Sequence, residues 1–117
     1  MAGEDQRAQE GGASDRKVLE LVVFGLRDGV SREQLLGTVD PVSAWIGKQS
    51  GFVSRELVHD AKGDRWIDVI WWRSLGEAHA AAEQAMSSAS CAPMFALIDM
   101  ESTLMLHGEA AIAPVAA

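Results

Sequence analysis

The chain has 117 residues and a formal net charge of −7, which leaves room for one globular domain and argues against a nucleic-acid partner. No cluster of Lys and Arg alternates with aromatic residues, and no apolar run approaches the roughly 20 residues that span a membrane. The single cysteine, Cys91, excludes an internal disulfide and is typical of a reducing compartment. These features predict a soluble, cytoplasmic protein.

The chain is predicted to divide into one domain and two tails. Residues 1–16 are polar and rich in glycine, so we expect a disordered N-terminal tail before a domain of residues 17–107. Lys17 to Leu26 is predicted to be the first strand, because large apolar residues occupy both of its faces. The only acid in this strand is Glu20. Residues 108–117 offer little to pack and are expected to form a loose C-terminal tail.

A helix follows the first strand. It is predicted to begin at Ser31, which fits a capping box together with Gln34. Asp40-Pro41 is typical of a new N-cap followed by a proline in the first turn, so we expect the helix to kink or restart there. Gly51 is the expected C-cap, and Phe52 to His59 is the expected second strand.

The third strand, Gly63 to Ser74, carries three of the four tryptophans and is apolar on both faces, as in a strand covered on both sides. Its one internal acid, Asp68, needs a partner. A four-residue hairpin loop, Asp60 to Gly63, would place Arg55 opposite Asp68. A five-residue loop would place Glu56 there, and like charges in opposed positions are destabilising. We therefore predict that Arg55 faces Asp68.

The remaining elements complete a βαββαβ order. Ser74 to Glu77 fits a second capping box before an alanine-rich helix, and Met100 to His107 is the expected last strand. This order predicts an α+β, ferredoxin-like fold with strand order 4-1-3-2 and two helices on one face of the sheet. We expect the first and third strands to be parallel. The apolar face without helices predicts a homodimer in which two sheets pack face to face.

Three ionisable residues, Glu20, Asp68 and His107, are expected at one end of the sheet on adjacent strands. Partial burial would raise the pKa of a carboxyl group, and histidine exchanges protons near neutral pH, so these three are the candidate catalytic residues. The alternative interpretation is structural, with Asp68 paired to Arg55 and Glu20 paired to His107.

Trp66 and Trp72 are candidates for stacking on a flat substrate, with Arg55 as a further candidate substrate contact. Packing in the core or at a dimer interface is the alternative for both tryptophans. The histidines lack the spacing of metal ligands, and no phosphate-binding glycine loop occurs, so neither a metal nor a cofactor is expected. His79 is expected to face the solvent.

The sequence resembles the dimeric α/β-barrel superfamily, in particular uncharacterised proteins of the antibiotic-biosynthesis monooxygenase type. Over about residues 17–107, the resemblance is carried by Glu20 to Phe24, Gly51, Phe52, Arg55, Trp66 to Asp68, Trp72, Ala78, Ala81, Ile98, Asp99, Ser102 and His107. It implies a homodimer whose two sheets form a barrel, with a small-molecule pocket in each subunit.

The superfamily includes monooxygenases without a cofactor, haem-degrading enzymes, isomerases, decarboxylases and proteins of no known activity, so the fold alone does not fix the reaction. The resemblance implies a small-molecule enzyme, such as a cofactor-independent monooxygenase or isomerase that acts on a flat, largely apolar metabolite. The alternative is a non-catalytic homodimer that binds a ligand or serves assembly.

Overall fold

The computed structural model describes residues 16–117, so the predicted disordered tail lies outside the described residues except for Arg16. In chain order the elements are β1 (Val18–Phe24), α2 (Arg32–Leu36), α3 (Val39–Ile46), β2 (Phe52–Asp60), β3 (Arg65–Trp72), α4 (Leu75–Ala85), α5 (Ala92–Phe95), a short 3-10 turn (Met100–Ser102) and β4 (Leu104–Glu109). None of the helices in this part of the chain has the length and hydropathy of a membrane span. The last strand, β4, runs from Leu104 to Glu109, so it begins and ends later than the predicted Met100 to His107.

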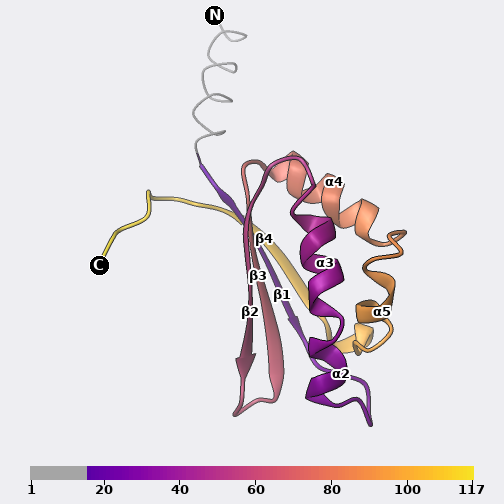
Figure 1. The fold of residues 1–117 in the computed structure, drawn as a ribbon. Coiled ribbons are helices and arrows are strands. Elements are labelled where there is room, and N and C mark those ends of the chain that lie inside the picture. The colour runs from indigo at the N-terminus through magenta and orange to yellow at the C-terminus, as the bar shows by residue number, and fades with distance from the viewer. Residues whose placement is uncertain (1–15) are drawn as a thin grey trace, which may run out of the picture.

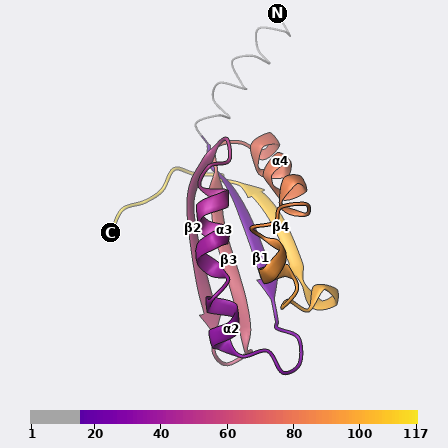
Figure 2. The same cartoon turned by 45° about the vertical axis from the view of Figure 1, so that its right-hand side comes forward.

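The four strands form one sheet in the order β2-β3-β1-β4, which is the predicted order read from the opposite edge. Helices α3, α4 and α5 cover one face of this sheet, and within the described chain nothing covers the other face (Figures 1 and 2). The predicted α+β, ferredoxin-like arrangement is therefore confirmed. Beyond β4 the C-terminal segment extends away from the sheet (Figure 1).

The prediction that β1 and β3 are parallel is wrong, because they pair as antiparallel neighbours. A crossover through α2 and α3 makes β1 parallel to β2, and the hairpin then reverses the direction of β3. In the observed register Glu20 lies opposite Ile70 and Val22 lies opposite Asp68. Glu20 and Asp68 are therefore diagonal neighbours, and Asp68 lies near the middle of the sheet instead of at the end that holds Glu20 and His107.

The predicted hairpin register is also wrong. Leu57 lies opposite Asp68, and Arg55 lies opposite Ile70, two residues further along β3 than predicted. A shift by two residues keeps every side chain on its original face of the sheet. Arg55 and Asp68 therefore still share the face that the helices cover, and a long arginine side chain can reach across the diagonal.

Local signals explain how the helices begin. The capping box of Ser31 and Gln34 is formed as predicted. The second part of the helix restarts at Thr38, not at Asp40, so that Pro41 falls in the first turn of α3, where its missing N–H leaves no bond unmade. The C-cap of this helix is Gly47, not Gly51 as predicted.

The α4 capping box is only half formed, because Ser74 accepts the bond from the Glu77 N–H while the Glu77 carboxylate has other partners. The Ser50 hydroxyl donates to this carboxylate at 2.6 Å, and the Ser74 hydroxyl donates to it at 2.9 Å. The turn after α3 is thereby tied to the first turn of α4.

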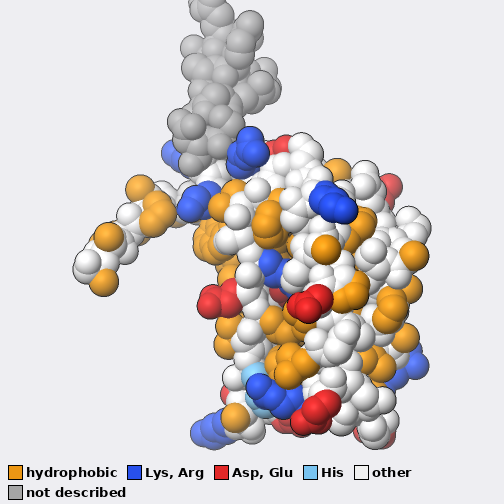
Figure 3. Space-filling view, viewed as in Figure 1, with side chains coloured by type: hydrophobic (Ala, Val, Ile, Leu, Met, Phe, Trp, Pro, Cys, Tyr) orange, Lys and Arg blue, Asp and Glu red, His pale blue; other side chains and the backbone are white. Residues whose placement is uncertain are grey.

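The core lies between the sheet and the helices. On β3 the buried side chains alternate and point toward the helices, as expected for a strand with one covered face. The most deeply buried large side chains are Trp72, Phe24, Leu35, Val18 and Cys91. On the side of the molecule seen in Figure 3, charged side chains are scattered and apolar side chains reach the surface between them. Two carboxylates, Glu20 and Asp68, are also buried in this layer.

Candidate functional site

A cavity of about 100 Å³ lies between the covered face of the sheet and helices α3, α4 and α5. Apolar side chains form most of its wall, among them Phe24, Trp45, Ile70, Met86, Met94 and Met105. Its charged residues are Glu20 from β1, Arg55 from β2 and Asp68 from β3. An apolar chamber that holds a few convergent charged groups has the general form of a small-molecule site.

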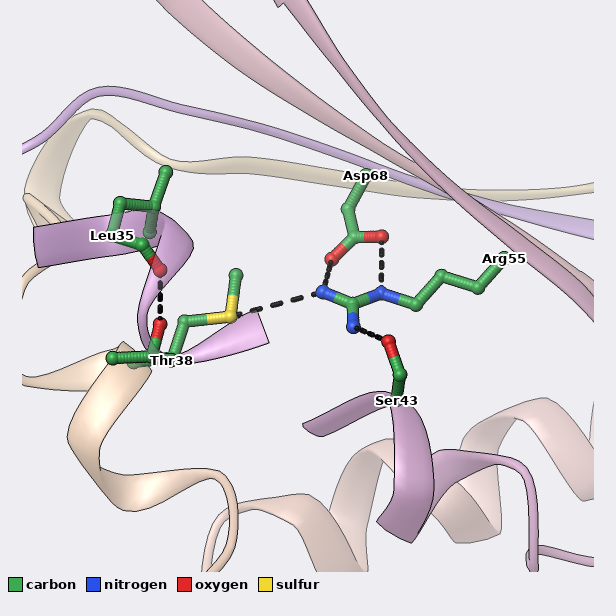
Figure 4. A network of polar contacts seen from close by, with 6 residues as sticks. Leu35, Thr38, Ser43, Arg55 and Asp68 are labelled. Carbon is green, nitrogen blue, oxygen red and sulfur yellow. Dashed lines mark hydrogen bonds and ion pairs between the residues drawn. The ribbon is translucent and has the colours of Figure 1, made fainter. Parts of the chain in front are cut away.

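Arg55 and Asp68 form a buried, bidentate ion pair, which confirms the predicted contact (Figure 4). Arg55 Nε and Nη2 donate to the two carboxylate oxygens of Asp68, each at 2.8 Å. Nη1 donates to the Ser43 hydroxyl at 2.9 Å, and Nη2 also lies 3.8 Å from the Met94 sulfur. The side chains of Arg55 and Asp68 are only 5% and 9% exposed, so this network is rigid and largely dry.

The helix that supports this network is held at its start by a hydroxyl group. In Figure 4 the Thr38 hydroxyl donates to the Leu35 carbonyl, at 2.6 Å, where α2 gives way to α3. Ser43 lies one turn further along α3. The hydrogen bond at the start of this helix therefore helps to position Ser43 beside Arg55.

Glu20 is held differently from Asp68. It is 6% exposed, and its Oε1 is hydrogen-bonded to His107 Nε2 at 3.3 Å, directly across the β1–β4 ladder. Burial raises the pKa of Glu20 above its ordinary value of 4.5, and the opposing effect of His107 does not offset this. The nearby carboxylate of Asp68 acts in the same direction as burial. Glu20 therefore keeps its proton to a higher pH than an exposed glutamate does.

Trp72 does not line the cavity, so a stacking contact between Trp72 and a substrate finds no support in this geometry. Its ring is fully buried and meets the edge of Phe52 at a centroid distance of 5.9 Å. Its indole N–H lies close enough to Glu20 to lower the pKa of that group slightly, but it meets no acceptor at hydrogen-bond geometry within residues 16–117. Trp72 therefore acts as a wall behind Glu20.

Trp66 borders a second hollow, of about 380 Å³, at the hairpin end of the sheet. Its ring lies 4.3 Å from the His59 ring, and the Arg32 guanidinium lies 5.3 Å from its centroid. Trp66 is itself buried and packs in the same core cluster as Phe24 and Met94. It therefore supports the wall of the smaller cavity from behind.

His79 lies beside His107, a contact that the sequence analysis did not predict. His79 is exposed on α4, as expected, but its ring lies 4.8 Å from that of His107, edge to face at 89°. The helical spacing of α4 does not reveal which turn meets β4, so no sequence signal could have identified this contact. Within the described part of the chain, no cluster of three His, Cys, Asp or Glu side chains is placed to hold a metal ion.

Comparison with known proteins supports the fold assignment. No protein-family model and no curated protein matches the chain. Among solved structures, it is similar to SnoaB, a cofactor-independent oxygenase from Streptomyces nogalater, with 16% identity, a TM-score of 0.63 and coverage of 86% of this chain and 96% of that one. The ActVA-Orf6 monooxygenase of Streptomyces coelicolor, solved with nanaomycin D, matches with 15% identity, a TM-score of 0.61 and coverage of 88% and 95%.

A dimeric protein of unknown function and ferredoxin-like fold from Bacteroides fragilis matches with 17% identity, a TM-score of 0.54 and coverage of 80% and 95%. At such identities the similarity establishes the fold alone, and it agrees with the predicted ferredoxin-like arrangement. The chemistry of the site has to be argued from its own residues.

Proposed function

We propose that this protein is a cofactor-independent enzyme that removes a proton from a small, flat, largely apolar molecule and directs the product to reaction with O₂. The observation that carries the proposal is the pair of buried carboxylates at one apolar cavity, of which only Asp68 is held by an arginine. Two neighbouring acids in such different environments are typical of sites that need one proton acceptor and one fixed charge. The oxygenase neighbours support the choice of oxygenation.

Each residue has a distinct role in this proposal. Glu20 is the general base, because its pKa is raised by burial toward the range in which proton transfer is efficient. Arg55 supplies positive charge at the cavity wall, where it stabilises the anion formed when the substrate loses its proton. Asp68 keeps Arg55 in place, and His107 receives the proton from Glu20. Trp66 and Trp72 hold the walls of the site from within the core.

The reaction balances without a further reductant. For a ketone with an acidic methylene group, Glu20 takes one proton and leaves a resonance-stabilised carbanion. The carbanion gives its electrons to O₂ and a carbon–oxygen bond forms, and the resulting peroxide anion takes up one proton. The second proton of the methylene group is then removed as the O–O bond breaks, and water leaves. The net change converts CH₂ and O₂ into C=O and H₂O, so that O₂ is the oxidant and the methylene carbon is oxidised.

The cavity must widen to admit such a molecule, since ligand pockets are commonly about 300 Å³ or larger. Two flexible side chains border it at exposed positions, Met86 after α4 and Met105 on β4. An unbranched methionine changes its rotamer at little cost, so these two residues can yield to a flat ligand. We infer that the entrance lies between them.

The proposal includes a homodimer formed through the uncovered sheet face. This face carries mainly apolar side chains that are partly or fully exposed in the single chain: Leu19, Leu21, Val23, Ile67, Val69, Trp71, Leu104 and Leu106. An apolar surface of this kind on a soluble domain is typical of a subunit interface. A second copy that presents the same face would cover it symmetrically.

Oxygen uptake with anthrone, a flat tricyclic ketone with an acidic methylene group, tests the proposal. We expect the wild-type protein to accelerate uptake and to convert anthrone to anthraquinone. Glu20→Gln keeps the size of the side chain but removes the base, so kcat should fall by about 10²-fold or more. Glu83→Gln, on the exposed surface of α4, is the matched control and should retain full activity.

Equal rates in the wild type and in Glu20→Gln would overturn the role of Glu20. Uptake no faster than in buffer, with anthrone binding still detected through tryptophan fluorescence, would favour the alternative of a non-catalytic ligand-binding homodimer. The saturation of the Asp68–Arg55 pair by its own partners is the observation that favours this alternative.

A further inference from the structure

We propose that His107 and His79 form a path along which protons pass between Glu20 at the cavity wall and the solvent. This inference rests on the proposed function, in which Glu20 must be a carboxylate at the start of each turnover and therefore has to exchange protons with the solvent. A buried base exchanges protons with the solvent through groups that can both accept and release a proton.

The geometry of the three residues carries the proposal. They come from three elements, β1, β4 and α4, and α4 lies beside β4 in Figure 2. Glu20 Oε1 lies 3.3 Å from His107 Nε2, and the rings of His107 and His79 lie 4.8 Å apart. Exposure rises along the series: Glu20 is buried, the His107 side chain is 15% exposed, and His79 is open to solvent.

No comparable path leaves the cavity through Asp68. Both of its oxygens are bound by Arg55, which does not give up a proton at ordinary pH. The other ionisable groups near the path are Glu83, one turn along α4 from His79, and Glu109, two residues along β4 from His107. Glu109 lies 3.9 Å from Arg16 at the surface. The path therefore leads outward through the histidines.

The proton transfer can be followed atom by atom. Protonated Glu20 gives its proton to Nε2 of neutral His107, and the carboxylate and imidazolium that result attract each other. The imidazolium then releases the proton on its other ring nitrogen, Nδ1. No hydrogen bond joins the two rings, so a water molecule carries the proton from His107 to His79.

The test needs no substrate. After a rapid pH jump, time-resolved infrared spectroscopy follows the C=O band of protonated Glu20, which is identified by its loss in Glu20→Gln. In His107→Gln the rate at which Glu20 is protonated should fall by about 10²-fold. Glutamine can donate a hydrogen bond, but it does not accept a proton and pass it on. The equilibrium pKa of Glu20 should rise further in this variant, since His107 lowers it.

His79→Gln separates proton transfer from structural support, because His79 is exposed and its loss should not affect folding. In this variant we expect the rate at which Glu20 is protonated to fall and the equilibrium pKa of Glu20 to stay unchanged. Imidazole added to the buffer should restore the rate. His59→Gln, which removes the histidine that packs on Trp66, is the control and should behave like the wild type.

A wild-type rate in His79→Gln, or a slower rate that imidazole does not restore, would overturn the path. Because the infrared signal is recorded without substrate, this result is independent of the anthrone assay. Failure of anthrone oxidation would contradict the proposed function and leave the infrared result unchanged. The two proposals are therefore tested independently.

Discussion

Glu20 and Asp68 are diagonal neighbours on the covered face of the sheet, yet Asp68 is paired with an arginine while Glu20 is hydrogen-bonded to a histidine. The difference follows from the strands beside them. β3 is bordered by β2, which brings Arg55, and β1 is bordered by β4, which brings His107. One sheet thus places two acids at one cavity, of which Asp68 is held by an arginine and Glu20 has its pKa raised by burial.

The first prediction concerns the buried ion pair. Arg55→Met should lower the free energy of unfolding by about 3–5 kcal/mol, because it leaves the carboxylate of Asp68 buried without a counter-ion. The double variant Arg55→Met/Asp68→Leu should recover most of this loss, since it removes both charges and fills the space with apolar atoms. Urea unfolding of both variants measures the two free energies.

Arg65→Met offers a matched control, because Arg65 pairs with Asp60 at 3.2 Å on the surface of the hairpin. This variant should unfold close to the wild type. A double variant as unstable as Arg55→Met alone would contradict the electrostatic explanation and would point to lost packing of the arginine stem.

The second prediction concerns the pH dependence of stability. Because the pKa of Glu20 is raised on folding, the folded state binds its proton more tightly than the unfolded state. The stability that this proton contributes is fully present below the ordinary value of 4.5 and is lost as the pH rises through the raised pKa. The free energy of unfolding of the wild type should therefore fall relative to that of Glu20→Gln as the pH rises through this window. Above the window the difference between the two proteins should stay constant.

Urea titrations of both proteins at a series of pH values measure this difference. A constant difference between the two proteins at every pH would show that Glu20 ionises equally easily in the folded and unfolded chains, contrary to its burial in the structure.

The third prediction concerns assembly. Leu106 is 51% exposed on the uncovered sheet face, and Leu75 is 45% exposed at the start of α4 on the helical side. Leu106→Glu should convert a dimer into a monomer, because a dimer interface would bury its charge. Leu75→Glu should remain dimeric. Light scattering coupled to gel filtration measures the mass, and a monomeric wild type at micromolar concentration would refute the proposed dimer.

The fourth prediction concerns the turn between α3 and β2. Gly51 has a φ of +84°, and a methyl group at this position would meet the side chain of Glu77. Gly51→Ala should cost about 1–2 kcal/mol for the left-handed backbone alone, and more if Glu77 must leave its bonds to Ser50 and Ser74. Gly76→Ala, where an added methyl group meets nothing within 4 Å, is the control, and thermal unfolding compares the two.

The alternation of apolar residues was sufficient to predict which side chains share a face. Leu19, Leu21 and Val23 lie on the face opposite to Val18 and Glu20, because a strand has a fixed period of two. This is also why the contact between Arg55 and Asp68 survived an incorrect register, since the error was an even number of residues.

The relative directions and positions of the strands were beyond such reasoning. The prediction of parallel β1 and β3 failed because alternation carries no information about strand direction. The direct opposition of Glu20 and His107 depends on the β1–β4 register, which is set by the length and path of the chain between α4 and β4. The contact of His79 with His107 depends on the rotation of α4 over the sheet, which tertiary packing determines.

The bond between Ser50 and Glu77 has a consequence for how this scaffold can diversify. It fastens the last turn after α3 to the first turn of α4, while the cavity lies toward the other end of α4, near Met86. The bond therefore fixes the position of α4 relative to α3 at the end away from the cavity. It places no constraint on the other end of α4, beside the cavity. Substitutions near Met86 and Met105 can change the size and shape of the accepted molecule, while the fastened end preserves the fold and the positions of the two acids.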